Sequence, residues 1–101
     1  MWELLDADIW RDGGSYSATL RSGEKTVSLW LQVASWDRIE DRTYQALFVS
    51  EGTDATKQSE RAEPAGWLAI LESDVDRGTA DDNSQKRLEE LIANLRSLCR
   101  R

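Results

Sequence analysis

The sequence contains no histidine, one cysteine, one proline and no long apolar run. Without histidine, the commonest general base and the commonest transition-metal ligand are missing, and so are Ser–His and Cys–His pairs. A single Cys99 cannot form an internal disulfide bond, so packing must supply the stability and a reducing compartment is permitted. We expect Cys99 to be a buried or half-buried thiol rather than a nucleophile. These absences predict that the protein is not an enzyme.

No segment predicts membrane insertion or secretion. The longest apolar run, residues 67–71, is far too short to span a bilayer. The first ten residues contain three acidic residues and no lysine or arginine, the reverse of a signal peptide's basic start. We therefore expect a cytoplasmic protein, and the length predicts a single domain over residues 1–101.

The negative charge is concentrated in one third of the chain. The formal net charge is −6, and residues 51–82 hold nine acidic residues against three basic ones. An acidic surface repels nucleic acid and attracts basic proteins, so we predict a protein partner and no nucleic-acid partner. The alternative is a solvated surface that only keeps the protein soluble.

The first half of the sequence alternates as strands do. We expect strands over residues 2–10, 15–21, 27–34 and 44–50. Val27, Leu29, Leu31 and Val33 predict an inward face, which places Trp30 on the opposite side. Hairpin turns are expected at Asp12-Gly13-Gly14 and at residues 22–25, because glycine adopts positive φ at little cost.

The second half predicts one certain element, a C-terminal helix. An apolar stripe with helical spacing runs along it (Leu88, Leu91, Ile92, Leu95 and Leu98). Asp82 and Gln85 fit a capping box at its start. Residues 52–66 are expected to form a surface loop. Residues 67–72 favour a strand, although Pro64 could start a short helix there.

The pattern as a whole predicts an α+β domain. We expect an antiparallel sheet of four or five strands that opens as a meander, with the amphipathic C-terminal helix packed on one face.

Carboxylates are the remaining candidates for chemistry. Asp6 and Asp8 should share one face of a strand, where they could share a proton or hold a divalent ion, but protection of an edge strand is the favoured interpretation. Residues 74–85 resemble a calcium loop only in their first aspartates, because Thr79 replaces the required glycine and Gln85 the bidentate glutamate. The sequence thus predicts no catalytic residue, no metal site and no cofactor.

Mixed aromatic and charged residues point instead to protein binding. Trp36 lies among charges in an expected loop over residues 36–43, a composition typical of interfaces. The favoured interpretation is nevertheless that Trp36 and Ile39 fold back as a lid on the core, because most tryptophans are largely buried. The predicted partner-binding residues come from this loop and from the acidic third of the chain, residues 51–82. They are Trp36, Asp37, Glu40, Glu60, Glu63, Asp74, Asp76 and Asp81.

Three short stretches carry a family resemblance: Asp8-Ile9-Trp10-Arg11-Asp12-Gly13-Gly14-Ser15-Tyr16, Leu29-Trp30-Leu31 and Gly66-Trp67-Leu68. With them the chain resembles the small immunity proteins of bacterial polymorphic toxin and contact-dependent growth inhibition systems. The resemblance implies a small, acidic α+β protein that needs no catalytic group. It also implies a function, the neutralisation of one cognate toxin domain, in many cases a nuclease with a basic cleft.

A second class of function remains open. The chain could be a small structural or regulatory subunit whose helix or sheet edge pairs with itself or with a host protein. Capture by an acidic face weakens with salt, whereas a hydrophobic subunit contact does not, so salt dependence separates the two hypotheses.

Overall fold

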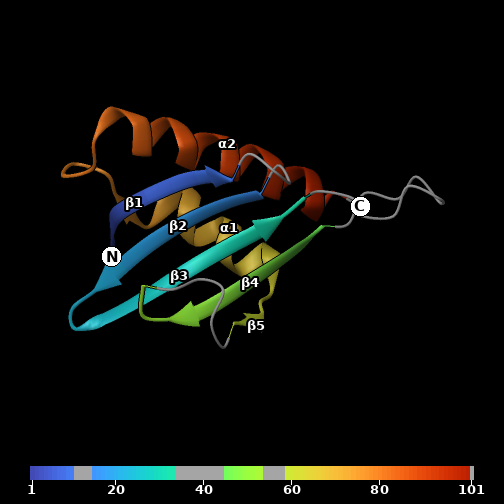
Figure 1. Ribbon diagram of the computed structural model, residues 1–101, viewed down its shortest axis with the longest axis horizontal. Coiled ribbons are helices and arrows are strands. Elements are labelled where there is room, and N and C mark those ends of the chain that lie inside the picture. The colour runs from blue at the N-terminus through green and yellow to red at the C-terminus, as the bar shows by residue number, and fades with distance from the viewer. Residues whose placement is uncertain (11–14, 34–44, 54–58, 101) are drawn as a thin grey trace.

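The computed structural model describes residues 1–10, 15–33, 45–53 and 59–100. The described part contains two helices and one sheet of six strands (Figure 1). The strands are β1 (Trp2–Trp10), β2 (Ser15–Ser22), β3 (Lys25–Gln32), β4 (Ala46–Glu51), β5 (Glu60–Arg61) and β6 (Val75–Asp76). The helices are α1 (Pro64–Ser73) and α2 (Asp82–Cys99). The α+β class that the sequence predicts is confirmed.

The sheet begins as the predicted antiparallel meander. Strands β1 to β4 pair in sequence order, and β5 extends the sheet beyond β4. The prediction of four or five antiparallel strands is wrong at the other edge, where β6 pairs with β1 in parallel. This strand has only two residues, Val75 and Asp76, so no alternation could reveal it.

The two predicted hairpins connect β1 to β2 and β2 to β3. The second turn is confirmed, since Ser22 pairs with Lys25 and Gly23 has a φ of 63°. In the first hairpin Trp10 pairs with Ser15, while the predicted turn residues Asp12, Gly13 and Gly14 lie outside the described residues.

Helix α1 corrects two predictions. Residues 67–72 are helical rather than a strand, and residues 52–66 are not all loop, because they contain β5 and the start of this helix. Pro64 occupies the first turn, where its fixed φ suits a helix and its missing N–H costs nothing. The Glu63 carboxylate accepts a hydrogen bond from the Ala65 N–H at 3.4 Å. These start signals outweigh the short apolar run that favoured a strand.

Helix α2 carries the predicted apolar stripe, with a shifted start. Asp81 rather than Asp82 is the N-cap, and its carboxylate accepts from the Ser84 N–H at 2.7 Å. Gln85 does not complete a capping box, because its amide donates to the carbonyl oxygens of Ala80 and Arg77.

Both helices lie on one side of the sheet, as Figure 1 shows, with α1 behind the central strands and α2 along β1. The hydrophobic core lies between these two helices and the sheet. Its fully buried members include Leu20, Leu29 and Leu31 from the sheet and Leu71, Leu88, Leu91, Ile92 and Leu95 from the helices. The predicted inward face of β3 is therefore confirmed, with Val33 packed at its margin. The opposite face of the sheet carries no described helix.

We predict that Leu29→Ala lowers the free energy of unfolding by about 2–5 kcal/mol, because it opens a cavity in the middle of this core. Leu5→Ala is the matched control, since Leu5 is 38% exposed beside a register shift in β1. It should change stability by less than about 0.5 kcal/mol. Urea unfolding measures both values, and equal losses would contradict the one-sided core.

Candidate functional site

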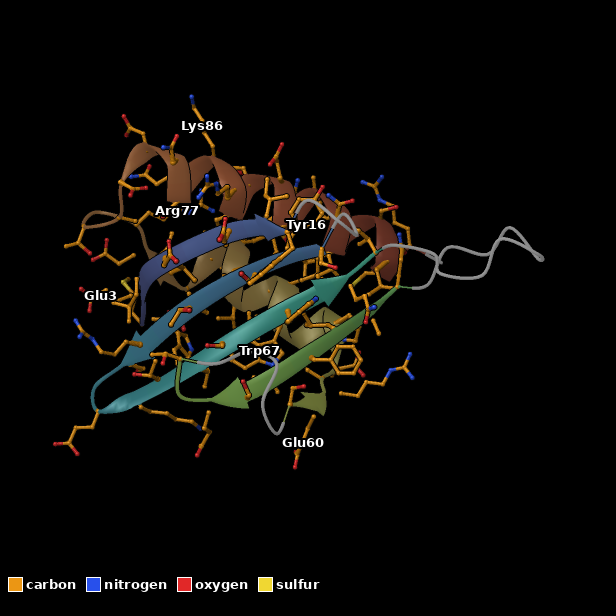
Figure 2. All side chains as sticks on the ribbon, in the orientation of Figure 1. Glu3, Tyr16, Glu60, Trp67, Arg77 and Lys86 are labelled. Atoms are coloured by element: carbon orange, nitrogen blue, oxygen red, sulfur yellow. The ribbon has the colours of Figure 1, made fainter. Side chains whose placement is uncertain are left out.

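The predicted acidic residues divide between two corners of the molecule. Glu60 lies in β5 and Glu63 caps the start of α1, whereas Asp74 ends the same helix. Asp76 lies in β6, at the opposite edge of the sheet from β5. Asp81 follows at the start of α2. Figure 2 shows the separation of the two corners. Glu60 lies at one edge of the sheet, and Glu3, the β1 residue that lies opposite Asp76 of β6 in the strand register, lies at the other.

Several of these acids organise the local backbone. Beyond the two N-caps, the Asp76 carboxylate accepts from the Gly78 N–H at 2.9 Å. Asp74 lies 3.9 Å from the N-terminal amine of Met1. These contacts explain why acidic residues occupy these positions, but each one leaves carboxylate surface in contact with solvent.

Most of these acids lack the basic side-chain partners that neighbouring acids have. Glu3, Glu72 and Glu89 form ion pairs with Arg21, Arg96 and Arg77. In the described ranges, by contrast, neither lysine nor arginine pairs with Glu60, Glu63, Asp76 or Asp81, and all four are exposed. None of these four carboxylates therefore forms an ion pair within this part of the chain, although the charge of Arg87 still acts on Asp81.

The remaining predicted binding residues, Trp36, Asp37 and Glu40, lie outside the described residues. The interpretations of Trp36 as an interface residue or as a lid both stay predictions.

The face of the sheet opposite α1 and α2, which carries no described helix, holds a pair of stacked tryptophans. The Trp10 and Trp30 rings are 5.8 Å apart with an interplanar angle of 2°, and Trp10 is 52% exposed. Phe48 is the cross-strand neighbour of Trp30 on β4. The outward position that alternation predicts for Trp30 is confirmed, although its contact with Trp10 was not predicted. An exposed aromatic of this size is a typical anchor for a protein partner.

Both edges of the sheet are protected against strand addition. At β1, the Arg87 guanidinium lies 3.3 Å from the Asp8 carboxylate and donates to the Ala7 carbonyl oxygen at 3.5 Å. Asp8 also accepts from the Ile9 N–H at 2.8 Å, and Asp6 accepts from the Ser84 hydroxyl at 3.1 Å. At the other edge β5 is only two residues long. Charged and short edges of this kind discourage intermolecular pairing.

A pocket of 460 Å³ opens on the helix side of the sheet, beside β4 and β5. Trp2 and Trp67 line it, with ring centroids 5.7 Å apart and planes tilted by 56°. Val27 and Val49 add an apolar surface, and the lining is completed by polar Ser50 and by the charged residues Lys25, Glu51 and Glu60. Figure 2 labels Trp67 and Glu60, which approach from α1 and β5.

Sequence reasoning identified only Glu60 among these lining residues. The signal for Trp2 was its alternation with Leu4 on β1, which places both side chains on the helix side. Trp67 could not be placed there while residues 67–72 were interpreted as a strand.

The described residues contain no group of three or more histidine, cysteine, aspartate or glutamate side chains that could hold a metal ion. Nor is any helix among them long and apolar enough to cross a membrane.

Cys99 departs from the prediction of a buried or half-buried thiol. It is exposed, one position beyond the stripe residue Leu98 and hence turned away from the core. Partial desolvation nevertheless raises the pKa of its thiol, and the carboxylates of Glu63 and Glu72 raise this pKa further. The thiol, not the more reactive thiolate, therefore predominates at neutral pH.

Hydrogen bonds from Ser84 and Asn83 and the charge of Arg87 lower the pKa of the Asp81 carboxyl below its ordinary value. A carboxyl whose pKa is lower in the folded state stabilises the fold above its unfolded pKa and loses this contribution as pH falls through the folded value. We predict that Asp81→Ala lowers the thermal midpoint at pH 7. Asp81→Asn should lower it less, because the amide oxygen still accepts from the Ser84 N–H.

The difference between the native chain and Asp81→Asn should then shrink as pH falls from about 4, where the carboxyl of the unfolded chain begins to bind a proton, through the lower pKa of the folded carboxyl. Thermal unfolding of the three proteins at pH 7 and pH 3 tests the assignment. A difference that stays constant across this range would contradict the capping role of the charge.

Comparisons with family models, with curated proteins and with solved structures return no match to this chain.

Proposed function

We propose that the protein is an immunity protein that binds and neutralises a cognate toxin domain in the cytoplasm. The proposal is one of binding rather than catalysis. Its main support is the acidic third, where the exposed carboxylates of Glu60, Glu63, Asp76 and Asp81 form no ion pair among the described residues. The resemblance of three stretches of the sequence to immunity proteins supplies the class of partner.

The charge favours a partner with a basic surface. Lysine and arginine side chains of a nuclease cleft would find exposed carboxylates that need not first break an ion pair in the described structure. Long-range attraction of this kind mainly accelerates association and excludes acidic competitors, while affinity comes from well-packed contacts near the centre of the interface. Trp10 offers one such contact, since half of it is exposed and its inner face is already held by Trp30.

The exposed tryptophan also favours a second candidate, a subunit that self-associates or binds a host protein. Such a subunit would use the face without a described helix, because Arg87 covers part of the β1 edge through Asp8 and the Ala7 carbonyl oxygen, and β5 is very short. Its contact would be apolar and nearly insensitive to salt.

A growth experiment tests the immunity function directly. An immunity gene should follow a large toxin gene, so the C-terminal domain encoded by the upstream neighbour is expressed alone and together with this protein. We expect growth arrest in the first case and recovery in the second. A harmless neighbour, or arrest that persists with this protein present, would overturn the proposal.

We predict that Asp76→Asn with Asp81→Asn slows association with that toxin domain by about three- to tenfold at low salt, with little change in dissociation. Asparagine keeps both side-chain acceptors, so the turn at Gly78 and the cap of α2 remain. Glu24→Gln with Glu90→Gln is the matched control, because it removes the same charge from two other exposed positions.

Stopped-flow or surface-plasmon measurements at 50 and 500 mM salt give the rates. Glu60→Gln with Glu63→Gln tests the other acidic corner in the same assay. If neither double variant slows association more than the control does, the role of the acidic corners is refuted. Sedimentation at several protein concentrations reports self-association, and a salt-resistant dimer would favour the subunit function.

A further inference from the structure

The pocket beside β4 and β5 combines three kinds of surface. Val27 and Val49 belong to the helix-facing side of the sheet, since Val49 pairs with the buried Leu29 and Val27 lies two residues before it. Trp2 and Trp67 contribute two aromatic surfaces tilted by 56° to each other. Its volume of 460 Å³ lies within the range of about 300–1,000 Å³ that is common for ligand pockets.

The charged residues of the lining have a net negative charge. Glu51 and Glu60 provide two carboxylates, whereas Lys25 provides one ammonium group. Lys25 lies 3.9 Å from Glu51, and the side chains are 60% and 81% exposed. An exposed pair at this distance is weak, so it presents little obstacle to a competing cation. Glu60 has no lysine or arginine partner among the described residues.

We propose that this pocket binds an arginine side chain of the partner protein. The inference rests on the proposed function, because a basic toxin domain supplies the arginine. A guanidinium group stacks on an aromatic ring and donates hydrogen bonds in its plane to carboxylates, so it can use both kinds of group present here. The valine side chains suit the methylene groups of the same side chain.

The arrangement disfavours anionic and purely apolar ligands. A carboxylate or phosphate would meet Glu51 and Glu60, and a purely apolar side chain would leave both carboxylates without a counter-charge. The tilt of the tryptophans offers a second aromatic surface to a cation that stacks on the first. The pocket therefore provides a specific anchor where the acidic corner of Glu60 and Glu63 provides only long-range attraction.

The test uses the full chain and a blocked amino acid, N-acetyl-L-arginine amide. Its neutral control is the citrulline analogue, which has nearly the same shape without the charge. Binding is followed by NMR through the indole N–H signals, assigned from single Trp→Phe variants. We expect the arginine probe to shift the signals of Trp2 and Trp67, with a dissociation constant on the order of millimolar, and to leave Trp10 and Trp30 unshifted.

Charge variants give effects of opposite sign. Glu51→Gln and Glu60→Gln should each weaken binding of the probe by about two- to fivefold, the range of an exposed charge contact. Lys25→Gln should tighten it by about twofold, because the competing ammonium group is lost. Glu24→Gln is the control, since it removes an exposed acid that does not line the pocket. Indole signals of Trp10 and Trp30 that stay in place show that each variant is folded.

Equal binding of the citrulline analogue, shifts confined to Trp10 and Trp30, or unchanged affinity in both glutamate variants would overturn the inference. The double variant Glu51→Gln with Glu60→Gln is also measured against the toxin domain, where we expect at least about tenfold weaker binding through faster dissociation. A toxin that is neutralised equally well by this variant would refute the arginine pocket while the immunity function stands. A failed growth rescue would refute the immunity function alone if the probe still bound.

Discussion

The packing of the α2 stripe against the aliphatic side of β1 and β2 and against α1 is the interaction on which the rest of the fold depends. Leu88, Leu91, Ile92 and Leu95 are fully buried in the same core as strand residues such as Leu20 and Leu29. Each such side chain contributes about 1.5–3 kcal/mol on leaving water. Because both helices occupy the same side, the protein has one core layer and one sheet surface without a described helix.

This one-sided architecture separates the parts of the molecule that can bind. The corner of the core side at β4 and β5 holds the aromatic pocket. The opposite side of the sheet holds the Trp10–Trp30 stack. The acidic residues lie at the two ends of α1 and at the start of α2, since a short helix and its connections cross the sheet from β5 to β6. One partner that engaged all three would have to wrap around the β4–β5 side, whereas a compact partner would use the pocket and one acidic corner.

The sequence predicted the elements whose patterns are long and regular. Alternation over β1 to β3 and the leucine spacing of α2 are each repeated several times, so local noise does not hide them. The prediction of a strand at residues 67–72 was wrong, because a run of five apolar residues fits both the helical and the strand period. The choice of a helix depends on Glu63 and Pro64, which precede the run. Strand β6 was also missed, because the pairing of Val75 with Trp2 depends on a contact between distant parts of the chain. The candidate pocket was missed for the same reason, since its two tryptophans lie 65 positions apart in the sequence and meet only in the folded molecule.

The protection of the β1 edge has a consequence for the way the chain is made. The Arg87 side chain that donates to the Ala7 carbonyl oxygen lies 80 residues later in the sequence. A chain emerging from the ribosome therefore leaves the Ala7 carbonyl oxygen on the outer edge of β1 without this partner until Arg87 has been synthesised. Contacts between such distant residues slow folding, and unpaired edges invite association while they last. The acidic residues Glu3 and Asp6 are already present on the nascent strand, and their like charges disfavour association with neighbouring copies during this interval.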